Sequence, residues 1–178
     1  KALNLATSGR QGPVWLDVPL DVQAAMIESD NLSSNNEIKM NEQPWNENGL
    51  EQVTQLISEA RRPLILAGHG IRLSGAADEF AALVEALEIP IVTTWNSLDL
   101  LPFEHPLMVG KPGSVALRAA NFAIQNCDLL ISIGARLDNV ITAHNPQGFA
   151  QHAKKIVVDI DVNEMKKHQM DIDVPVIA

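Results

Sequence analysis

Short apolar runs alternate with amphipathic stretches over most of the chain. The run at 129–133 lies between a polar cluster and Gly134, and it is typical of a central strand buried on both faces. The same reasoning predicts further strands at 64–67, 89–94, 155–160 and 174–177. Apolar residues at helical spacing predict helices at 48–60, 80–87 and 114–125, with one or two helical turns at 164–169.

This alternation of strands and helices predicts an α/β fold. Right-handed crossovers make a doubly wound, mostly parallel, Rossmann-like sheet with helices on both faces the expected arrangement. Between the second and third predicted helices, residues 98–113 form a long segment that we predict to be irregular. Ligands of such sheets bind at the carboxyl ends of the strands, so the loop that carries Arg136 and Asp138 is the first place to look for function.

The first part of the chain follows a different pattern. Residues 1–10 are helix-like, and Pro13 and Pro19 bracket a predicted strand at 14–18. A polar stretch rich in Asn, Ser and Glu follows, and we interpret it as a linker. Because a lone strand needs a sheet to join, we infer that the chain begins inside a domain whose larger part is missing.

Composition narrows the class of protein. The 178 residues carry a formal net charge of -9, which would repel a phosphate backbone and makes nucleic acid an unexpected partner. No apolar run approaches the roughly 20 residues that span a bilayer, and the first residues do not resemble a signal peptide. We therefore predict a cytoplasmic protein without a membrane partner. The single cysteine, Cys127, excludes an intrachain disulfide, and we expect it to be a packed thiol.

Three predicted strands end in residues suited to a nucleotide. The segment 68–70, Gly-His-Gly, permits close backbone approach, and Gly134-Ala135-Arg136 places a guanidinium beside another strand end. Asp159 and Asp161 could accept hydrogen bonds from ribose hydroxyls. Together these residues suggest a nucleotide crevice, although the glycines alone are also explained by tight turns between strand and helix. They do not form the G-x-G-x-x-G fingerprint.

A further candidate is the segment 110–114, Gly-Lys-Pro-Gly-Ser, which precedes a predicted helix. Free amides at a helix start could cradle a diphosphate, although a surface turn with an exposed lysine fits equally well. No metal-binding spacing and no nucleophile motif is present. From its residues alone, the chain looks like a nucleotide-binding module without its own catalytic apparatus.

Several stretches resemble the acetolactate-synthase-like family of thiamine-diphosphate enzymes. The segments are SGRQGPVWLDVPLDVQ, RRPLILAGHGI, IPIVTT, HPL, AAN, CDLLISIGARLD, AKKIVVDIDVNEMKK and DVPV, in this order. The resemblance implies that 1–27 is the end of a pyrimidine-binding domain, that 28–47 is a linker, and that 48–178 is most of the central, nucleotide-binding domain.

The resemblance also implies an activity for the whole enzyme. Such an enzyme condenses or decarboxylates a 2-oxo acid such as pyruvate, with thiamine diphosphate and Mg²⁺, and acetolactate synthases act in branched-chain amino acid biosynthesis. The activating glutamate and the G-D-G motif of the family are absent from these residues, so we expect the fragment alone to be inactive. Expected partners are the other domains of the enzyme, within a homodimer or tetramer.

In acetolactate synthases the central domain binds FAD, which is structural rather than redox-active in the net reaction. The positions that match the flavin-binding segments are Gly68, His69, Gly70, Thr94, Gly110, Gly113, Gly134, Arg136, Asp159, Ile160, Asp161, Asp173 and Val174. Two segments depart from the family: 113–117 is GSVAL in place of G-M-H-G-T, and 136–140 is RLDNV in place of R-F-D-D-R. A flavin-free scaffold domain of a related decarboxylase or lyase, and a nonenzymatic nucleotide sensor, are therefore alternatives.

Overall fold

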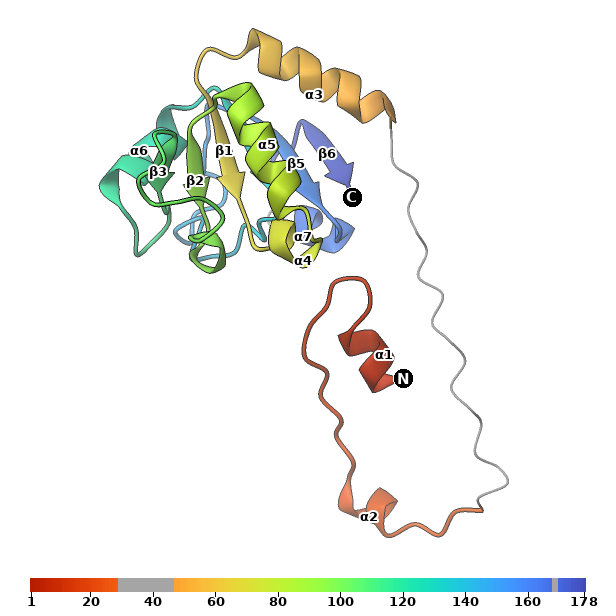
Figure 1. Ribbon diagram of the computed structural model, residues 1–178. Coiled ribbons are helices and arrows are strands. Elements are labelled where there is room, and N and C mark those ends of the chain that lie inside the picture. Colours follow the sequence, from red (N-terminus) through yellow and green to blue (C-terminus); the bar gives the residue numbers. More distant parts are fainter. Residues whose placement is uncertain (29–46, 168–169) are drawn as a thin grey trace. The chain divides into compact units, whose positions relative to one another are not determined.

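The structure, a computed structural model, describes residues 1–28, 47–167 and 170–178. A six-stranded sheet forms the centre of the part from residue 47 onward. Its strands are β1 (Pro63–Ala67), β2 (Ile91–Thr93), β3 (Met108–Gly110), β4 (Leu129–Ile133), β5 (Lys154–Asp159) and β6 (Val174–Ile177). They lie in the order β3-β2-β1-β4-β5-β6, and every neighbouring pair is parallel (Figure 1). The predicted α/β fold is confirmed, with a sheet that is wholly rather than mostly parallel.

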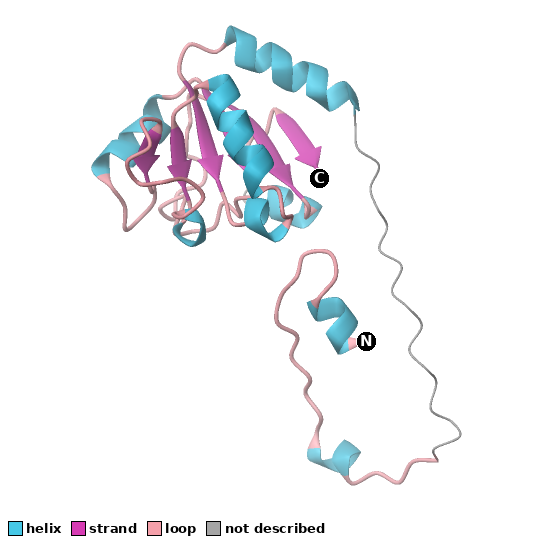
Figure 2. Cartoon of the chain, viewed as in Figure 1, coloured by secondary structure: helices cyan, strands magenta, loops and turns pink. Residues whose placement is uncertain are grey.

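Helices cover both faces of this sheet, as a doubly wound fold requires (Figure 2). They are α3 (Glu47–Glu59), α4 (Gly70–Leu73), α5 (Ala77–Leu87), α6 (Arg118–Asn126) and α7 (Val162–Lys166), with a short 3-10 turn, η2 (Trp95–Ser97). Val84 of α5 packs in the core of one face, and Ile124 of α6 packs in the core of the other. Within the described ranges, no helix combines length with enough apolar character to cross a membrane.

The apolar run at 129–133 is the central strand β4, with β1 on one side and β5 on the other. Leu130 belongs to the core on the α6 face, whereas Leu129 and Ile131 belong to the core on the α5 face. Because both faces of the strand are covered, every position benefits from an apolar side chain. This explains the nearly unbroken run in the sequence.

The first 28 residues belong to a separate unit that comprises residues 1–42. Its described part contains the helices α1 (Ala2–Ala6) and α2 (Leu20–Gln23). The strand predicted at 14–18 is wrong, because these residues pair with no strand in the described part of the chain. A strand needs a neighbour for its N–H and C=O groups, and here Trp15 remains 89% exposed. Most of the predicted linker at 28–47 lies outside the described residues.

Two local predictions also differ from the structure. Part of the segment predicted to be irregular forms the short edge strand β3, which has too few residues to show a periodicity. The helix expected from Ser114 begins only at Arg118. The preceding residues are held in a turn, in which the backbone N–H of Leu117 donates to the carbonyl of Lys111 at 3.1 Å.

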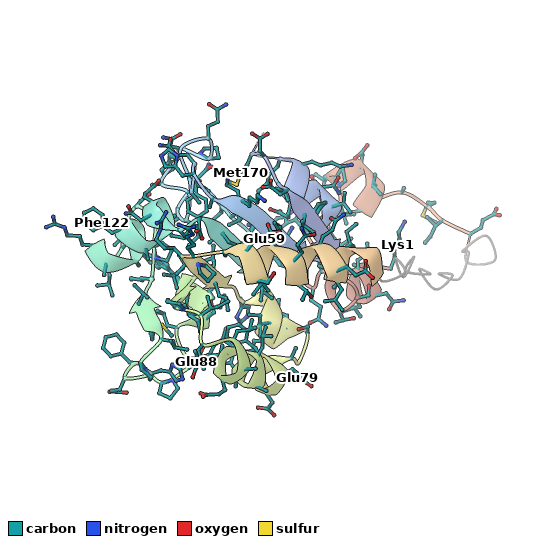
Figure 3. The ribbon with its side chains drawn as sticks, turned by 90° about the horizontal axis from the view of Figure 1, so that it is seen from above. Lys1, Glu59, Glu79, Glu88, Phe122 and Met170 are labelled. Carbon is teal, nitrogen blue, oxygen red and sulfur yellow. The ribbon has the colours of Figure 1, made fainter. Side chains whose placement is uncertain are left out.

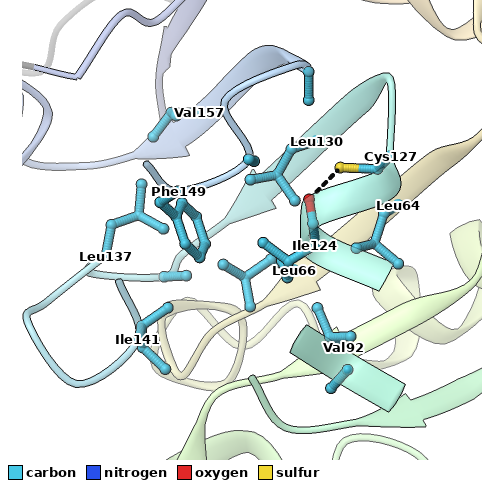
Figure 4. Close-up of a cluster of buried hydrophobic side chains, with 14 residues drawn as sticks. Leu64, Leu66, Val92, Ile124, Cys127, Leu130, Leu137, Ile141, Phe149 and Val157 are labelled. Atoms are coloured by element: carbon cyan, nitrogen blue, oxygen red, sulfur yellow. Dashed lines mark hydrogen bonds between the residues drawn. The ribbon is translucent and has the colours of Figure 1, made fainter. Parts of the chain in front are cut away.

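Cys127 is a packed thiol, as predicted. Its side chain is buried between α6 and β4 (Figure 4), and Sγ donates a hydrogen bond to the carbonyl of Ile124 at 3.1 Å. Burial raises the pKa of the thiol to about 11. The protonated form therefore dominates at neutral pH, and the residue lacks the thiolate that a nucleophile needs.

Two buried serines provide a test of the packing of the sheet. Ser132 of β4 is fully buried, and its Oγ makes no hydrogen bond with any described residue. Ser97, which is equally buried, donates from Oγ to the carbonyl of Ala67 at 2.9 Å. Removing an unpartnered hydroxyl relieves a desolvation cost, so we expect Ser132→Ala to raise the free energy of unfolding by about 1 kcal/mol.

Ser97→Ala is the matched control for this substitution. It removes a hydroxyl that has a partner and takes from the Ala67 carbonyl one of its two donors, the other being the N–H of Thr94, so we expect a loss of about 1 kcal/mol. Urea unfolding followed by circular dichroism measures both changes. A loss for Ser132→Ala as large as that for Ser97→Ala would show that the Ser132 hydroxyl has a partner, such as a buried water.

Candidate functional site

The order of the strands places a topological switch point between β1 and β4. The chain proceeds from β1 to β2 on one side and from β4 to β5 on the other. In doubly wound sheets the ligand crevice lies at the carboxyl ends of such a strand pair. The structure therefore brings together two predicted site segments at this point, 68–70 after β1 and 134–136 after β4.

The glycines of these two segments pack directly against each other. Gly68 donates its N–H to the carbonyl of Ile133 at 2.9 Å, and Gly70 donates to the carbonyl of Gly134, also at 2.9 Å. A Cβ atom on Gly68 would lie 2.2 Å from the Gly134 carbonyl oxygen. The tight-turn interpretation thus accounts for these glycines, and the two loops close the switch point against each other.

His69 and Thr94 lie at the same edge of the sheet, after β1 and β2. Both are partly buried. The Nδ1 atom of His69 is 2.8 Å from the carbonyl oxygen of Asn96. The Thr94 hydroxyl is 2.6 Å from the hydroxyl of Ser97, and the Thr94 N–H donates to the carbonyl of Ala67. These contacts fix the loop after β2 beside the loop after β1.

Two backbone amides of the segment 110–114, which we considered as a diphosphate cradle, are hydrogen-bonded within the described structure. Gly113 donates its N–H to Oδ1 of Asn121 at 2.9 Å, and Ser114 donates to the carbonyl of Val140 at 2.9 Å. Lys111 places Nζ 4.2 Å from the centre of the Trp95 ring. Two of the amides that a diphosphate cradle would need are therefore already used, and the helix itself begins only at Arg118.

A pocket lies at the carboxyl ends of β4 and β5. Its lining combines an arginine and two acidic side chains with apolar groups: Ala135, Arg136, Leu137, Val157, Asp159, Glu164, Met165, Met170 and Ile172. It is a shallow pocket whose ≈ 270 Å³ of free space includes open solvent. The part that a water-sized sphere can occupy is only ≈ 10 Å³, so a nucleotide would lie against the open surface of this pocket rather than inside an enclosed cavity.

The side chains of Asp159 and Asp161 hold the backbone that follows β5, beside this pocket, through hydrogen bonds. The Oδ1 atom of Asp159 accepts the N–H of Asp161 at 2.9 Å, and Oδ1 of Asp161 accepts the N–H of Asn163 at 2.9 Å, which caps α7. Ile160 lies between them and is 51% exposed. Within the described part of the chain, Oδ2 of Asp159 accepts no hydrogen bond, so it is available to a ligand.

The pocket includes residues that sequence reasoning missed. Glu164 pairs with Arg136, with 3.4 Å between Oε1 and Nε. Met165, Met170 and Ile172 belong to the short helix α7 or to loops near it, where no apolar periodicity marks a buried face. The only signal for Glu164 was its position a few residues after the Asp159-Ile160-Asp161 segment.

Asp173 and Val174 lie away from the other predicted site residues. Asp173 precedes β6, so it lies at the amino ends of the parallel strands. Its Oδ2 accepts the N–H of Lys155 at 2.8 Å, and its own N–H donates to the carbonyl of Lys155 at 3.0 Å. Val174 is buried in the core. Both residues therefore help to align β6 with β5.

Comparison with known proteins shows to which family the chain belongs. A family model described as the thiamine pyrophosphate enzyme central domain matches residues 50–178. The chain belongs to this family. The segments of the acetolactate-synthase-like resemblance extend through nearly the whole chain and agree with this assignment. All strands of the described sheet, β1 to β6, lie within the matched range.

Similar proteins within this family are named acetolactate synthases. The chain is 36% identical to a probable acetolactate synthase large subunit of Methanocaldococcus jannaschii, over 99% of the chain and 30% of the relative. It is 36% identical to the acetolactate synthase large subunit of Lactococcus lactis subsp. lactis, over 100% of the chain and 31% of the relative. The chain thus spans about 30% of the length of these curated relatives. It is acetolactate-synthase-like, and it corresponds to their central region.

Proposed function

We propose that this chain is the central domain, with the end of the pyrimidine-binding domain, of a thiamine-diphosphate-dependent transferase that joins 2-oxo acids such as pyruvate. We further propose that its pocket holds the nucleotide portion of FAD. The names of the relatives support the first proposal. The second rests on one observation, that Arg136 and Asp159 line the same pocket at the carboxyl edge of the sheet.

The groups in the pocket fit a nucleotide. Asp159 offers a free carboxylate oxygen, which is the acceptor that ribose hydroxyls need. Arg136 offers a guanidinium, which suits a diphosphate. Leu137, Met165 and Met170 offer apolar surface, against which an adenine ring can pack. The pocket thus combines a few polar groups with apolar surface, as ligand sites usually do.

The role of this chain in the whole enzyme is then to bind and orient. FAD would add a rigid, structural connection at the carboxyl edge of the central domain, and thiamine diphosphate with Mg²⁺ would supply the carbanion chemistry from sites in other domains. The chain's own residues hold the ribose at Asp159 and the diphosphate at Arg136. The domain limits 1–27, 28–47 and 48–178, the homodimer or tetramer and the cytoplasmic location all belong to this proposal.

Asp159→Asn tests the ribose contact. The amide oxygen of asparagine can still accept the N–H of Asp161, but an NH₂ group replaces the free oxygen Oδ2. We expect the dissociation constant for FAD of the full-length protein to rise about tenfold, the equivalent of one charge-assisted hydrogen bond. Flavin fluorescence titration of the protein after removal of its FAD measures the change.

Asp173→Asn is the matched control, because the same substitution is made at the amino ends of the strands. The asparagine oxygen can still accept the N–H of Lys155, so the fold and the FAD affinity should be retained. Equal losses of affinity in the two variants would contradict the proposed site. A wild-type protein that is active without binding FAD would instead support a flavin-free scaffold domain. The close packing of the two glycine loops and the hydrogen bonds already made by the amides of Gly113 and Ser114 would then be its structural basis.

A further inference from the structure

The pocket contains a largely buried acid that the proposed function does not use. The Glu164 side chain is 11% exposed, and it lies between two cations, Arg136 and Lys167. Removing a carboxylate from water is costly unless opposite charges compensate it. The two ion pairs provide that compensation, and they tie the position of Arg136 to a side chain with little freedom of its own.

Arg136 is held at one nitrogen and is otherwise available. Its Nε lies 3.4 Å from Oε1 of Glu164, while the arginine side chain is 62% exposed and lines the pocket. Among the described residues, none forms a hydrogen bond or ion pair with its two terminal nitrogens. A guanidinium fixed through Nε still has donors on both terminal nitrogens, and this planar arrangement matches the oxygens of a phosphate.

The position of Glu164 is itself set by the sheet. Asp159, at the end of β5, accepts the N–H of Asp161, and Asp161 caps α7 through the N–H of Asn163. Glu164 lies in the first turn of this helix. A short series of hydrogen bonds thus connects the end of the strand to the residue that holds Arg136. Such an arrangement reduces the entropy that Arg136 loses when it binds an anion.

We propose that Glu164 is a positioning residue, which holds Arg136 so that its terminal nitrogens bind the diphosphate group of a dinucleotide. This inference rests on the proposed function, since it concerns the same pocket. It adds that the affinity for the diphosphate depends on a residue that does not touch the ligand. It also predicts that Glu164 acts only through Arg136.

A double-mutant cycle in the full-length protein tests this dependence. The probes are FAD and ADP, and ADP carries the diphosphate without the flavin. We expect Glu164→Ala to raise both dissociation constants about tenfold, which corresponds to a typical interaction free energy between two residues in contact. Glu164→Gln should restore binding only in part, because the amide oxygen can lie near Nε but does not carry the charge that forms the ion pair. In an Arg136→Ala background, Glu164→Ala should have no further effect.

Glu79→Ala is the control for the loss of a glutamate. Like Glu164, Glu79 lies in the first turn of a helix, but it is exposed on α5, away from the pocket (Figure 3). It should leave both dissociation constants unchanged. If Glu164→Ala weakens binding equally with and without Arg136, its role is a general structural one and the inference is wrong. If Glu164→Ala binds as wild type does, the inference is wrong and the proposed function stands. If the wild type binds neither probe, both are wrong.

Discussion

Gly68→Ala is expected to lower the free energy of unfolding by at least about 3 kcal/mol, the upper part of the range for overpacking. The added Cβ would lie 2.2 Å from the carbonyl oxygen of Gly134 and 2.4 Å from the Cα of Ala135. Both are backbone atoms of the loop after β4, so no side-chain rotation can relieve the contact. The two loops would have to separate, and the hydrogen bond from Gly68 to Ile133 would be lost with them.

Gly49→Ala is the control for this substitution. Gly49 lies in helix α3, and a Cβ there would meet no atom within 4 Å. Because alanine is the better helix former, this variant should be more stable by up to about 1 kcal/mol. Urea unfolding followed by circular dichroism measures both variants. A Gly68→Ala protein as stable as wild type would contradict the close packing of the two loops at the switch point.

Asp128→Ala is expected to lower the free energy of unfolding by about 2 kcal/mol at neutral pH. The Asp128 carboxylate accepts the backbone N–H groups of Arg61 and Arg62, at 2.9 and 2.8 Å, and so connects the start of β1 to the start of β4. Removing it leaves two donors without their acceptor. Because the carboxylate is partly exposed, water replaces some of the lost interaction, so we expect less than the roughly 3–6 kcal/mol of two fully buried charged hydrogen bonds.

The effect of Asp128 should depend on pH. Partial burial raises the pKa of Asp128, but the backbone hydrogen bonds from Arg62 and Arg61 and the charge of Arg62 outweigh it, so the pKa lies below its ordinary 3.8. A carboxyl group with a lowered pKa stabilises the folded state above its unfolded pKa, and this contribution disappears as the pH falls through the folded value. The difference between wild type and Asp128→Ala should therefore be constant near neutrality and shrink in acid. A difference that stays constant in acid would show that the charge of Asp128 does not contribute.

Much of the fold could be predicted from the sequence, because the burial of strands and helices produces a recognisable pattern of apolar residues. The run at 129–133 is covered on both faces and forms β4. The strands β1, β2 and β5 were predicted with small errors at their ends, and β6 was predicted with the observed bounds. The edge strand β3 was missed, because three residues are too few to show a periodicity of apolar positions. The strand expected at 14–18 was wrong, because a strand depends on a partner that the pattern of one segment does not reveal.

The candidate site could be predicted only in part. The topology brings Gly68, Gly134, Arg136 and Asp159 to one edge of the sheet, as strand-end reasoning suggested. The use of the Gly113 and Ser114 amides could not be foreseen, since their acceptors on Asn121 and Val140 are set by tertiary packing. The same is true of Glu164, whose importance depends on the position of Arg136 across the pocket. Spacing along the chain identifies strand ends, but not which donors remain free there.

The most direct test of the proposed FAD site is the visible absorbance spectrum of the full-length protein and of the supernatant after heat denaturation. We predict the spectrum of an oxidised flavin in the folded protein, and its release in about equal molar amount when the protein unfolds. Asp159→Asn should retain less of it than wild type, and Asp173→Asn should retain as much. A colourless protein that converts pyruvate with thiamine diphosphate, and does not respond to added FAD, would contradict the proposal.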